Sequence, residues 1–221
     1  MFEHKKMMFE ELNTESIGGN RHYITPNGAY PSITTVLGVL SKQGIAEWRA
    51  RVGEEVANRI STQAARRGTN VHQMCEDYVN NELDKTKFLP HEKAMFNSIK
   101  KVLDESLGLV YAQECPLYSD YLGIAGRVDC VAEYNGRLSI IDYKTSGKMK
   151  KKEWIGNYFQ QASAYCVMFE ERTKIPVDQI VIVVAVENED KAQVFVEKRD
   201  NYIGECIKTM EKYKESLNVD K

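Results

Sequence analysis

Two aspartates and a lysine lie in a stretch of the chain that has the pattern of a buried β-hairpin. Asn135-Gly136 separates two apolar runs, and this dipeptide is typical of a two-residue type I′ turn. The register set by such a turn places Asp129 directly opposite Asp142, with Cβ atoms about 5 Å apart. Side chains alternate along a strand, so Lys144 points to the same face as Asp142.

This arrangement has the chemistry of a metal site. The surrounding residues are apolar on both faces of the predicted strands: Val128, Cys130, Val131, Ala132, Ile140 and Ile141. Two opposed buried carboxylates repel and raise each other's pKa unless a positive charge lies between them. A divalent cation bound by Asp129 and Asp142 would remove this repulsion. In the same register Arg127 faces Lys144, so two basic side chains lie beside the predicted cation.

The composition is that of an ordinary globular protein rather than of a disordered or fibrous chain. Of the 221 residues, 43% are hydrophobic and 28% are charged, and the net charge is −2. No apolar run approaches the roughly 18 residues of a membrane span, and residues 1–20 lack the apolar core of a signal peptide. The five cysteines form no C-x-x-C pair, which favours reduced packing residues. We therefore expect a cytoplasmic protein without a secretion or mitochondrial targeting signal.

The apolar periodicity predicts an α+β protein with a central mixed β-sheet flanked by helices and a helical N-terminal part. We expect a loosely ordered polar leader over residues 1–20, one domain over residues 21–221, and a small hairpin around Pro26-Asn27-Gly28. The predicted helices are 33–41, 44–66, 69–83, 90–107, 151–172 and 201–216, with breaks at Gly44, Gly53 and Gly68. The predicted strands are 109–118, 123–134, 137–144, 179–187 and 192–198.

Two further pairs of polar residues share a helix face because their members are four positions apart. His72 and Glu76 lie on a helix predicted before the sheet, and Gln161 and Tyr165 lie on the helix after the hairpin. By residue type alone, the first pair is equally typical of a solvated helix surface. The second is equally typical of a polar residue beside a core aromatic.

The order of these motifs resembles that of the PD-(D/E)xK nucleases of the RecB-like branch. The motifs are Gly68-x-x-x-His72, Gly126-x-x-Asp129, Asp142-x-Lys144-Thr145 and Gln161-x-x-x-Tyr165. The stretch GRVDCVAEYNGRLSIIDYKTS is still more similar to the mitochondrial genome maintenance exonuclease group, and the resemblance extends from about Tyr30 to Tyr213. The chain departs from the pattern where Val128 replaces the superfamily's proline and Tyr143 replaces a tryptophan. The missing targeting sequence favours a phage or bacterial relative.

The resemblance implies a restriction-endonuclease-like fold and a role for each candidate residue. Together with the oxygen ligands it implies Mg²⁺ or Mn²⁺ as the cofactor, and no iron–sulfur cluster. The implied metal ligands are His72, Asp129, Asp142 and the backbone carbonyl of Tyr143. Lys144 would orient or help deprotonate the attacking water, Gln161 and Tyr165 would contact the phosphate or the water, and Glu114 and Glu76 would support the site. Glu114 is equally typical of a surface acid on an edge strand.

The resemblance also implies the substrate, namely single-stranded DNA cut from an end by a metal-dependent exonuclease in DNA repair, replication or recombination. Helices over residues 33–66 would cover the strand, and no replication or recombination protein is identified as a partner. Basic residues near the carboxylates predict phosphate contacts, although such runs are commonly solvated loops: Lys148, Lys150, Lys151, Lys152, Arg66 and Arg67. Two alternatives stay open, a double-strand end-resecting recombination exonuclease of the lambda type and a catalytically inactive DNA-binding module.

Overall fold

A five-stranded mixed β-sheet with the strand order β4-β5-β6-β7-β8 forms the centre of the molecule. The computed structural model describes residues 1–219 of the chain. The strands are β4 (Leu107–Ser119), β5 (Ile124–Tyr134), β6 (Arg137–Ser146), β7 (Gln179–Val186) and β8 (Gln193–Lys198). Strands β6 and β7 run parallel, and the other neighbours are antiparallel. The α+β class and the mixed sheet predicted from the sequence are confirmed.

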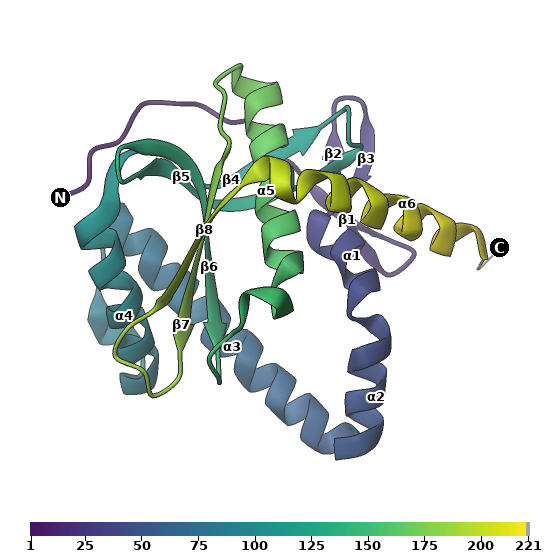
Figure 1. The fold of residues 1–221 in the computed structure, drawn as a ribbon, viewed down its shortest axis with the longest axis horizontal. Coiled ribbons are helices and arrows are strands. Elements are labelled where there is room, and N and C mark those ends of the chain that lie inside the picture. Colours follow the sequence, from purple (N-terminus) through teal and green to yellow (C-terminus); the bar gives the residue numbers. More distant parts are fainter. Residues whose placement is uncertain (220–221) are drawn as a thin grey trace.

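Helices cover both faces of this sheet (Figure 1). Helices α3 (Glu54–Val79) and α4 (Pro90–Ser106) pack on one face, and α1 (Ile33–Leu37), α5 (Gly156–Thr173) and α6 (Ile203–Val219) lie on the other. Strand β7 is apolar at successive positions because its side chains enter the two cores alternately, Ile180 on one face and Val181 on the other. An unbroken apolar run therefore marks a strand buried on both faces.

Between α1 and α3 the chain turns a sharp corner. Helix α2 (Lys42–Val52) ends at Gly53, whose φ of 85° lies in the region that favours glycine, and α3 begins at the next residue. No residue of α2 is buried, and the α2–α3 corner projects away from the sheet (Figure 1). The predicted break at Gly53 is confirmed. The breaks predicted at Gly44 and Gly68 are wrong because both lie inside helices, where one glycine costs only about 1 kcal/mol.

The N-terminal residues form a second, three-stranded antiparallel sheet. Its strands are β1 (Thr14–Ile17), β2 (Asn20–Thr25) and β3 (Gly28–Pro31), as expected for the predicted hairpin around Pro26-Asn27-Gly28. Backbone hydrogen bonds of Glu3 and Lys5 with Val110 join the segment before β1 to β4 of the large sheet. This order differs from the loosely ordered leader expected over residues 1–20. The boundary between a leader and a domain stays a prediction.

The hairpin of β5 and β6 opens into a fork. Both residues of the Asn135-Gly136 turn have positive φ, as a type I′ turn requires. The predicted register is confirmed from the turn as far as the pair Cys130↔Ile141. Beyond this pair the ladder between the two strands ends, and β5 continues beside β4 while β6 continues beside β7.

At the fork a side chain takes the place of the expected strand pairing. Asp129 and Asp142 were predicted to be opposed, but the Tyr143 N–H donates instead to Oδ2 of Asp129 at 2.8 Å. The predicted pairing of Arg127 with Lys144 is also wrong, because the strands have separated there. The carboxylate of Asp129 therefore satisfies a backbone donor that the interrupted ladder leaves free.

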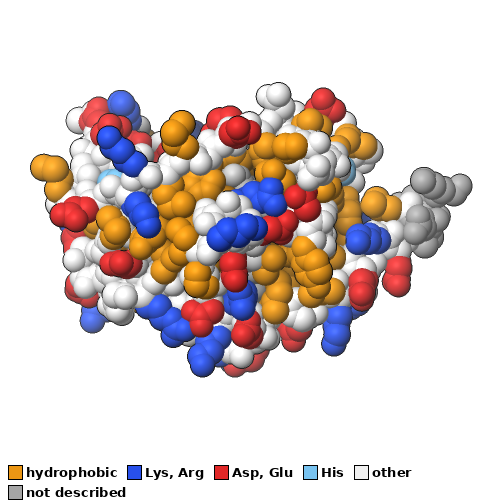
Figure 2. All heavy atoms as spheres, turned by 90° about the horizontal axis from the view of Figure 1, so that it is seen from above, with side chains coloured by type: hydrophobic (Ala, Val, Ile, Leu, Met, Phe, Trp, Pro, Cys, Tyr) orange, Lys and Arg blue, Asp and Glu red, His pale blue; other side chains and the backbone are white. Residues whose placement is uncertain are grey.

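Charges of both signs are interspersed on the surface. Figure 2 shows Lys and Arg side chains lying among acidic and hydrophobic ones on the face seen from above, in keeping with the net charge of −2. Within residues 1–219, no helix has both the length and the apolar character needed to cross a membrane. The five cysteines are free and buried, as expected for packing residues.

The close approach of α5 to β5 requires a glycine at position 126. A Cβ atom there would lie 2.7 Å from Oη of Tyr165 and 3.0 Å from Cγ2 of Ile33. We expect Gly126→Ala to lower the free energy of unfolding by about 1–3 kcal/mol, measured by urea denaturation. Gly156→Ala is the matched control, since no atom lies within 4 Å of its Cβ position. Equal losses in the two variants would contradict this packing.

Candidate functional site

Most of the predicted site residues line one cavity of about 830 Å³ beside the fork: His72, Glu76, Glu114, Asp129, Lys144, Gln161 and Tyr165. The first two belong to α3, the last two to α5, and the others to β4, β5 and β6. Helices α3 and α5 approach the sheet from opposite faces. The fork is where side chains from both helices reach the same space.

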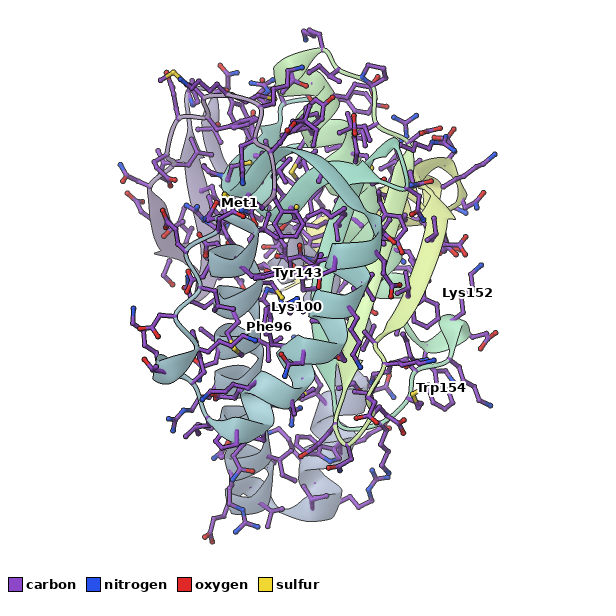
Figure 3. All side chains as sticks on the ribbon, turned by 90° about the vertical axis from the view of Figure 1, so that its left-hand side faces the viewer. Met1, Phe96, Lys100, Tyr143, Lys152 and Trp154 are labelled. Carbon is purple, nitrogen blue, oxygen red and sulfur yellow. The ribbon has the colours of Figure 1, made fainter. Side chains whose placement is uncertain are left out.

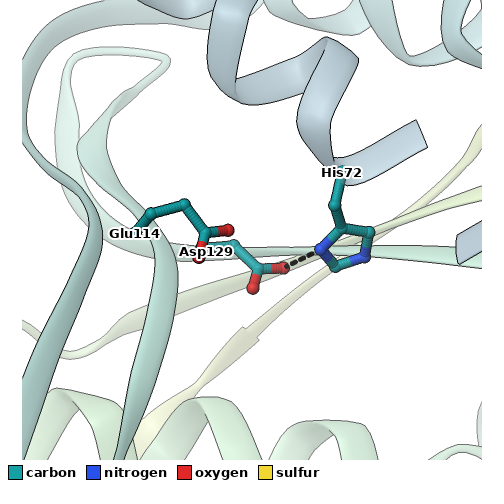
Figure 4. Close-up of side chains that lie close together, drawn as sticks. All are labelled: His72, Glu114 and Asp129. Atoms are coloured by element: carbon teal, nitrogen blue, oxygen red, sulfur yellow. Dashed lines mark ion pairs between the residues drawn. The ribbon is translucent and has the colours of Figure 1, made fainter. Parts of the chain in front are cut away.

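Three potential metal ligands converge on this cavity (Figure 4). One ligand atom from each of His72, Glu114 and Asp129 lies within 4.8 Å of the other two. Nδ1 of His72 is 3.5 Å from Oδ2 of Asp129. Two atoms that each lie about 2.1 Å from one octahedral cation are about 3 Å apart, so a small approach of these groups would complete such a site. The ring of Tyr143 meets that of His72 edge-to-face at 6.1 Å and supports its orientation.

Glu114 has an unusual backbone for its residue type. Its φ is 42°, in the left-handed region that residues other than glycine rarely adopt. It lies across from Asp129, between two paired positions of the β4–β5 ladder. Backbone strain of this kind costs about 1–3 kcal/mol and is concentrated at functional sites. Burial, followed by the charge of Asp129, raises the pKa of the Glu114 carboxyl to about 8.

Asp142 is the most deeply buried acid at the site, with 1% of its surface exposed. Within the described part of the chain, neither of its carboxylate oxygens has a hydrogen-bond partner, although Nζ of Lys144 lies 2.5 Å from Oδ2 as an ion pair. Desolvation raises the pKa of Asp142 to about 6; Lys144 opposes this rise and Asp129 adds to it. Desolvation of a carboxylate costs on the order of several kcal/mol unless charges and hydrogen bonds compensate it.

Lys144 supplies a fixed positive charge beside these acids. Its burial opposes the charged form, but attraction by Asp142 and Asp129 exceeds this effect and raises the Lys144 pKa. The ring of Tyr158 lies 5.3 Å from Nζ, which is a further favourable contact for a cation. The ammonium group also faces the cavity.

The donor set fits a hard divalent cation, with ligands partly different from those predicted. His72 and Asp129 converge as expected, and Glu114, predicted as a supporting residue, joins them. Asp142 lies outside this group of close ligand atoms, yet its oxygens lack hydrogen bonds to the described residues. The Tyr143 backbone is fixed at the site by its N–H bond to Asp129. Its side chain is buried in the core between the sheet and helices α3 and α4. Carboxylate oxygens and one imidazole nitrogen suit both Mg²⁺ and Mn²⁺.

The two helix pairs predicted from the sequence both reach the cavity. Gln161 lines the cavity and is 9% exposed. Tyr165 also lines the cavity, and its hydroxyl donates to the carbonyl oxygen of Arg127 at 2.8 Å, which ties α5 to β5. Burial, followed by the charge of Asp77, raises the pKa of Glu76.

The predicted DNA-binding residues lie outside the cavity wall: Lys148, Lys150, Lys151, Lys152, Arg66 and Arg67. Of these residues, Lys152 forms an ion pair with Glu197. Arg67 pairs with Glu187 at 3.5 Å. Figure 3 shows Lys152 and Trp154 at the outer side of the sheet, away from α4. The loop that carries Lys148, Lys150, Lys151 and Lys152, called the lysine loop below, therefore lies outside the wall of the cavity that holds the acids.

The structure also adds residues that the sequence analysis did not single out. The N-terminal strands and α1 contribute one part of the cavity wall: Leu12, Thr14, Arg21, Tyr23 and Thr34. No motif spacing connects them to the carboxylates, because a separate sheet brings them there. Arg127, which was noted only as the partner of Lys144, donates to Glu11 and to the carbonyl oxygen of Glu114.

A mixed sheet with acids and a lysine at a strand fork, flanked by helices on both faces, has the architecture of a restriction-endonuclease-like nuclease domain. The family described as the PD-(D/E)XK nuclease superfamily matches residues 93–217, more than half of the chain. This protein belongs to that superfamily. The matched region contains the acids of β4, β5 and β6, whereas His72 and the N-terminal sheet precede it.

The chain is also similar to named relatives over part of its length. Mitochondrial genome maintenance exonuclease 1 of Mus musculus is 31% identical over 111 residues, which are 48% of this chain and 32% of that protein. The Homo sapiens protein of the same name is 29% identical over 133 residues, 54% of this chain and 38% of that protein. The chain thus spans about a third of the length of these relatives. The crystal structure of SSO0001 aligns with 85% of this chain and 75% of that chain, at a TM-score of 0.47 and 14% identity.

The raised pKa of Glu114 predicts a pH-dependent stability of the metal-free protein. Its carboxyl binds a proton more tightly in the folded state, so the stabilisation is complete below its ordinary pKa and is lost as pH rises to about 8. We expect the melting temperature in EDTA to fall by a few degrees between about pH 5 and pH 8. Glu114→Gln should reduce this slope.

The control for this measurement is Glu211→Gln, at an exposed position on α6. Its slope should match that of the unaltered protein. An identical slope in Glu114→Gln would show that Glu114 does not retain its proton in the folded state.

Proposed function

We propose that this chain is a divalent-metal-dependent DNA exonuclease that hydrolyses phosphodiester bonds at single-stranded ends. The observation that carries the proposal is the buried carboxylate of Asp142, which has no hydrogen-bond partner among the described residues and is held beside Lys144. A buried ion pair is weak evidence for stability, because apolar residues of similar volume are often at least as stabilising. Binding of a cation by Asp142 would account for a buried carboxylate at this position.

The chain's own residues divide the work of phosphodiester hydrolysis between them. A bound Mg²⁺ or Mn²⁺ supplies charge neutralisation at the phosphate and a lowered pKa for the attacking water. Asp129, Glu114 and His72 hold the cation, and Asp142 completes its environment from the second strand of the fork. Lys144 orients the water and stabilises the charge that develops on the phosphate oxygens. Its raised pKa keeps it protonated, which favours this electrostatic role over that of a base.

The remaining cavity residues position the substrate and the strands. The amide of Gln161 can donate to a phosphate oxygen or to the water. Tyr165 acts indirectly, because its bond to the Arg127 carbonyl fixes the strand that carries Asp129. Glu76 supports the site from the helix face of His72.

The substrate and the type of cleavage are proposed from similarity. Two relatives carry exonuclease and mitochondrial genome maintenance in their names, which supports DNA as the substrate and a role in its repair, replication or recombination. The helices over residues 33–66, which include α2 with no buried residue, are proposed to cover the strand. Residues 21–221 are proposed to form one nuclease domain.

Removal of either charged partner at the fork should abolish cleavage without unfolding the protein. We expect Asp142→Asn and Lys144→Met each to lower the single-turnover rate by at least about 10³-fold, since each loses a charge that acts in the transition state. Asp142→Asn should also raise the melting temperature in EDTA, because burial and the nearby charge of Asp129 make the ionised form of Asp142 unfavourable even beside Lys144. Circular dichroism checks the fold, and a rate equal to that of the unaltered protein in either variant would overturn the site.

The assay that tests the proposed activity uses labelled single-stranded and duplex oligonucleotides with free and blocked ends. Cleavage of free single-stranded ends in Mg²⁺ or Mn²⁺, and none in EDTA, is the expected result. Preference for duplex ends would favour a recombination exonuclease of the lambda type. Binding without cleavage in either metal would favour an inactive DNA-binding module.

The lysine loop should contribute to binding but not to chemistry. We propose that Lys148, Lys150 and Lys151 contact phosphates as point charges, and that Lys152 contributes less because Glu197 already pairs with it. Changing the first three to Gln should weaken binding of single-stranded DNA and lower the slope of log affinity against log salt by about 0.7 per contact. The saturating rate should stay unchanged. Lys152→Gln is the contrasting variant, and an unaltered slope in the triple variant would contradict the assignment.

A further inference from the structure

The N-terminal sheet forms a wall of the cavity that carries the acids. Thr14 of β1, Arg21 and Tyr23 of β2, and Thr34 of α1 line it together with His72. This wall lies outside residues 93–217, the part that matches the nuclease family. The cavity that holds the acids is therefore bounded in part by side chains from a segment that precedes the family match.

The three basic side chains on the cavity wall differ in what already holds them. Arg127 donates to Glu11 at 2.5 Å and to a backbone carbonyl. Lys144 lies 2.5 Å from the carboxylate of Asp142. Within residues 1–219, Arg21 has no acidic partner, and its side chain donates to a single hydroxyl, that of Thr34, at 3.1 Å.

Arg21 is nevertheless held in place. Its carbonyl oxygen accepts the N–H of Ser32 at 2.9 Å, which ties β2 to the start of α1. Its guanidinium carbon lies 5.7 Å from the ring centre of the buried Tyr23. One end of a planar fork is thus fixed by Thr34, and most of its N–H donors stay available to the cavity.

A phosphate is the chemical group that such a fork recognises best. A guanidinium matches phosphate oxygens with two parallel hydrogen bonds and is charged at every physiological pH. The cavity volume of about 830 Å³ lies in the range that encloses a whole small ligand, so it has room for more than the scissile group. The acids that line the cavity would repel a second phosphate. The guanidinium of Arg21 on the N-terminal wall offsets that repulsion.

We propose that Arg21 binds a backbone phosphate of the substrate strand adjacent to the scissile one, and so sets the register of the strand in the site. This assignment rests on the proposed nuclease function. Arg21 is a positioning residue, because the groups that face the reacting phosphate are those of the fork.

The test is a scan of neutral phosphates along the strand. A fluorescein-labelled single-stranded oligothymidylate carries one methylphosphonate, moved position by position, and its affinity is measured by anisotropy in Ca²⁺ for the unaltered protein and Arg21→Gln. The unaltered protein should lose about 10-fold at the position that Arg21 contacts. Arg21→Gln should bind the unmodified strand about 10-fold more weakly and show no further loss at that one position.

Two variants keep the result interpretable. Arg21→Lys keeps the charge without the fork and should recover part of the affinity. Arg137→Gln removes an arginine that pairs with Asp178 at the far end of the β5–β6 hairpin, and it should leave the whole profile unchanged.

The outcomes separate this proposal from the one on which it rests. If Arg21→Gln gives the same position profile as the unaltered protein, Arg21 binds no phosphate and the inference is overturned, while cleavage by the unaltered protein still supports the nuclease. If the unaltered protein neither binds nor cleaves the strand in Mg²⁺ or Mn²⁺, the proposed function itself is overturned.

Discussion

The hydrogen bond from the Tyr143 N–H to the carboxylate of Asp129 marks the constraint on which the site depends. Up to Cys130↔Ile141 the two strands satisfy each other's backbone groups, and after it they part. An open sheet in a protein interior leaves donors unpaired unless side chains replace the missing strand. Asp129 does this and also lies beside His72 at the cavity. The residue that satisfies this backbone donor thus also lines the cavity that side chains of α3 and α5 share.

The charges at the fork do not cancel. This distinguishes the fork from a buried ion pair that serves only to stabilise the fold. Lys144 is paired with Asp142, whereas Glu114 forms no ion pair with the described residues, and the charge of Arg127 only partly opposes the rise in its pKa. Burial, with the charge of Asp129 adding to it, raises the pKa of Glu114 to about 8 and that of Asp142 to about 6. The left-handed backbone of Glu114 is a further feature that costs free energy in the metal-free protein. Each of these features is unfavourable in the metal-free protein and favourable with a divalent cation present.

The sequence predicted what short-range rules control and missed what long-range packing decides. The Asn135-Gly136 turn set the register of the hairpin correctly, since turn geometry fixes pairing locally. The same rule failed at Asp129, because the departure of β5 towards β4 is a property of the whole sheet. Gln161 reached the cavity as its helix spacing indicated. The backbone of Glu114, the ion pair of Lys152 with Glu197 and the cavity position of Arg21 have no local signature, because their partners lie far away in sequence.

Residues 93–217 and the segment before them contribute different features to the site. Residues 93–217 carry the acids of the fork, and their order along the chain is what a family model detects. The segment before them supplies His72 and the wall formed by β1, β2 and α1. A metal centre needs fixed donor distances and tolerates little change, whereas a wall that holds a strand needs only charge and shape. In the proposed nuclease, we therefore expect differences in how a strand is held to lie in the wall formed by β1, β2 and α1, and the positions of the metal ligands, His72 among them, to vary less.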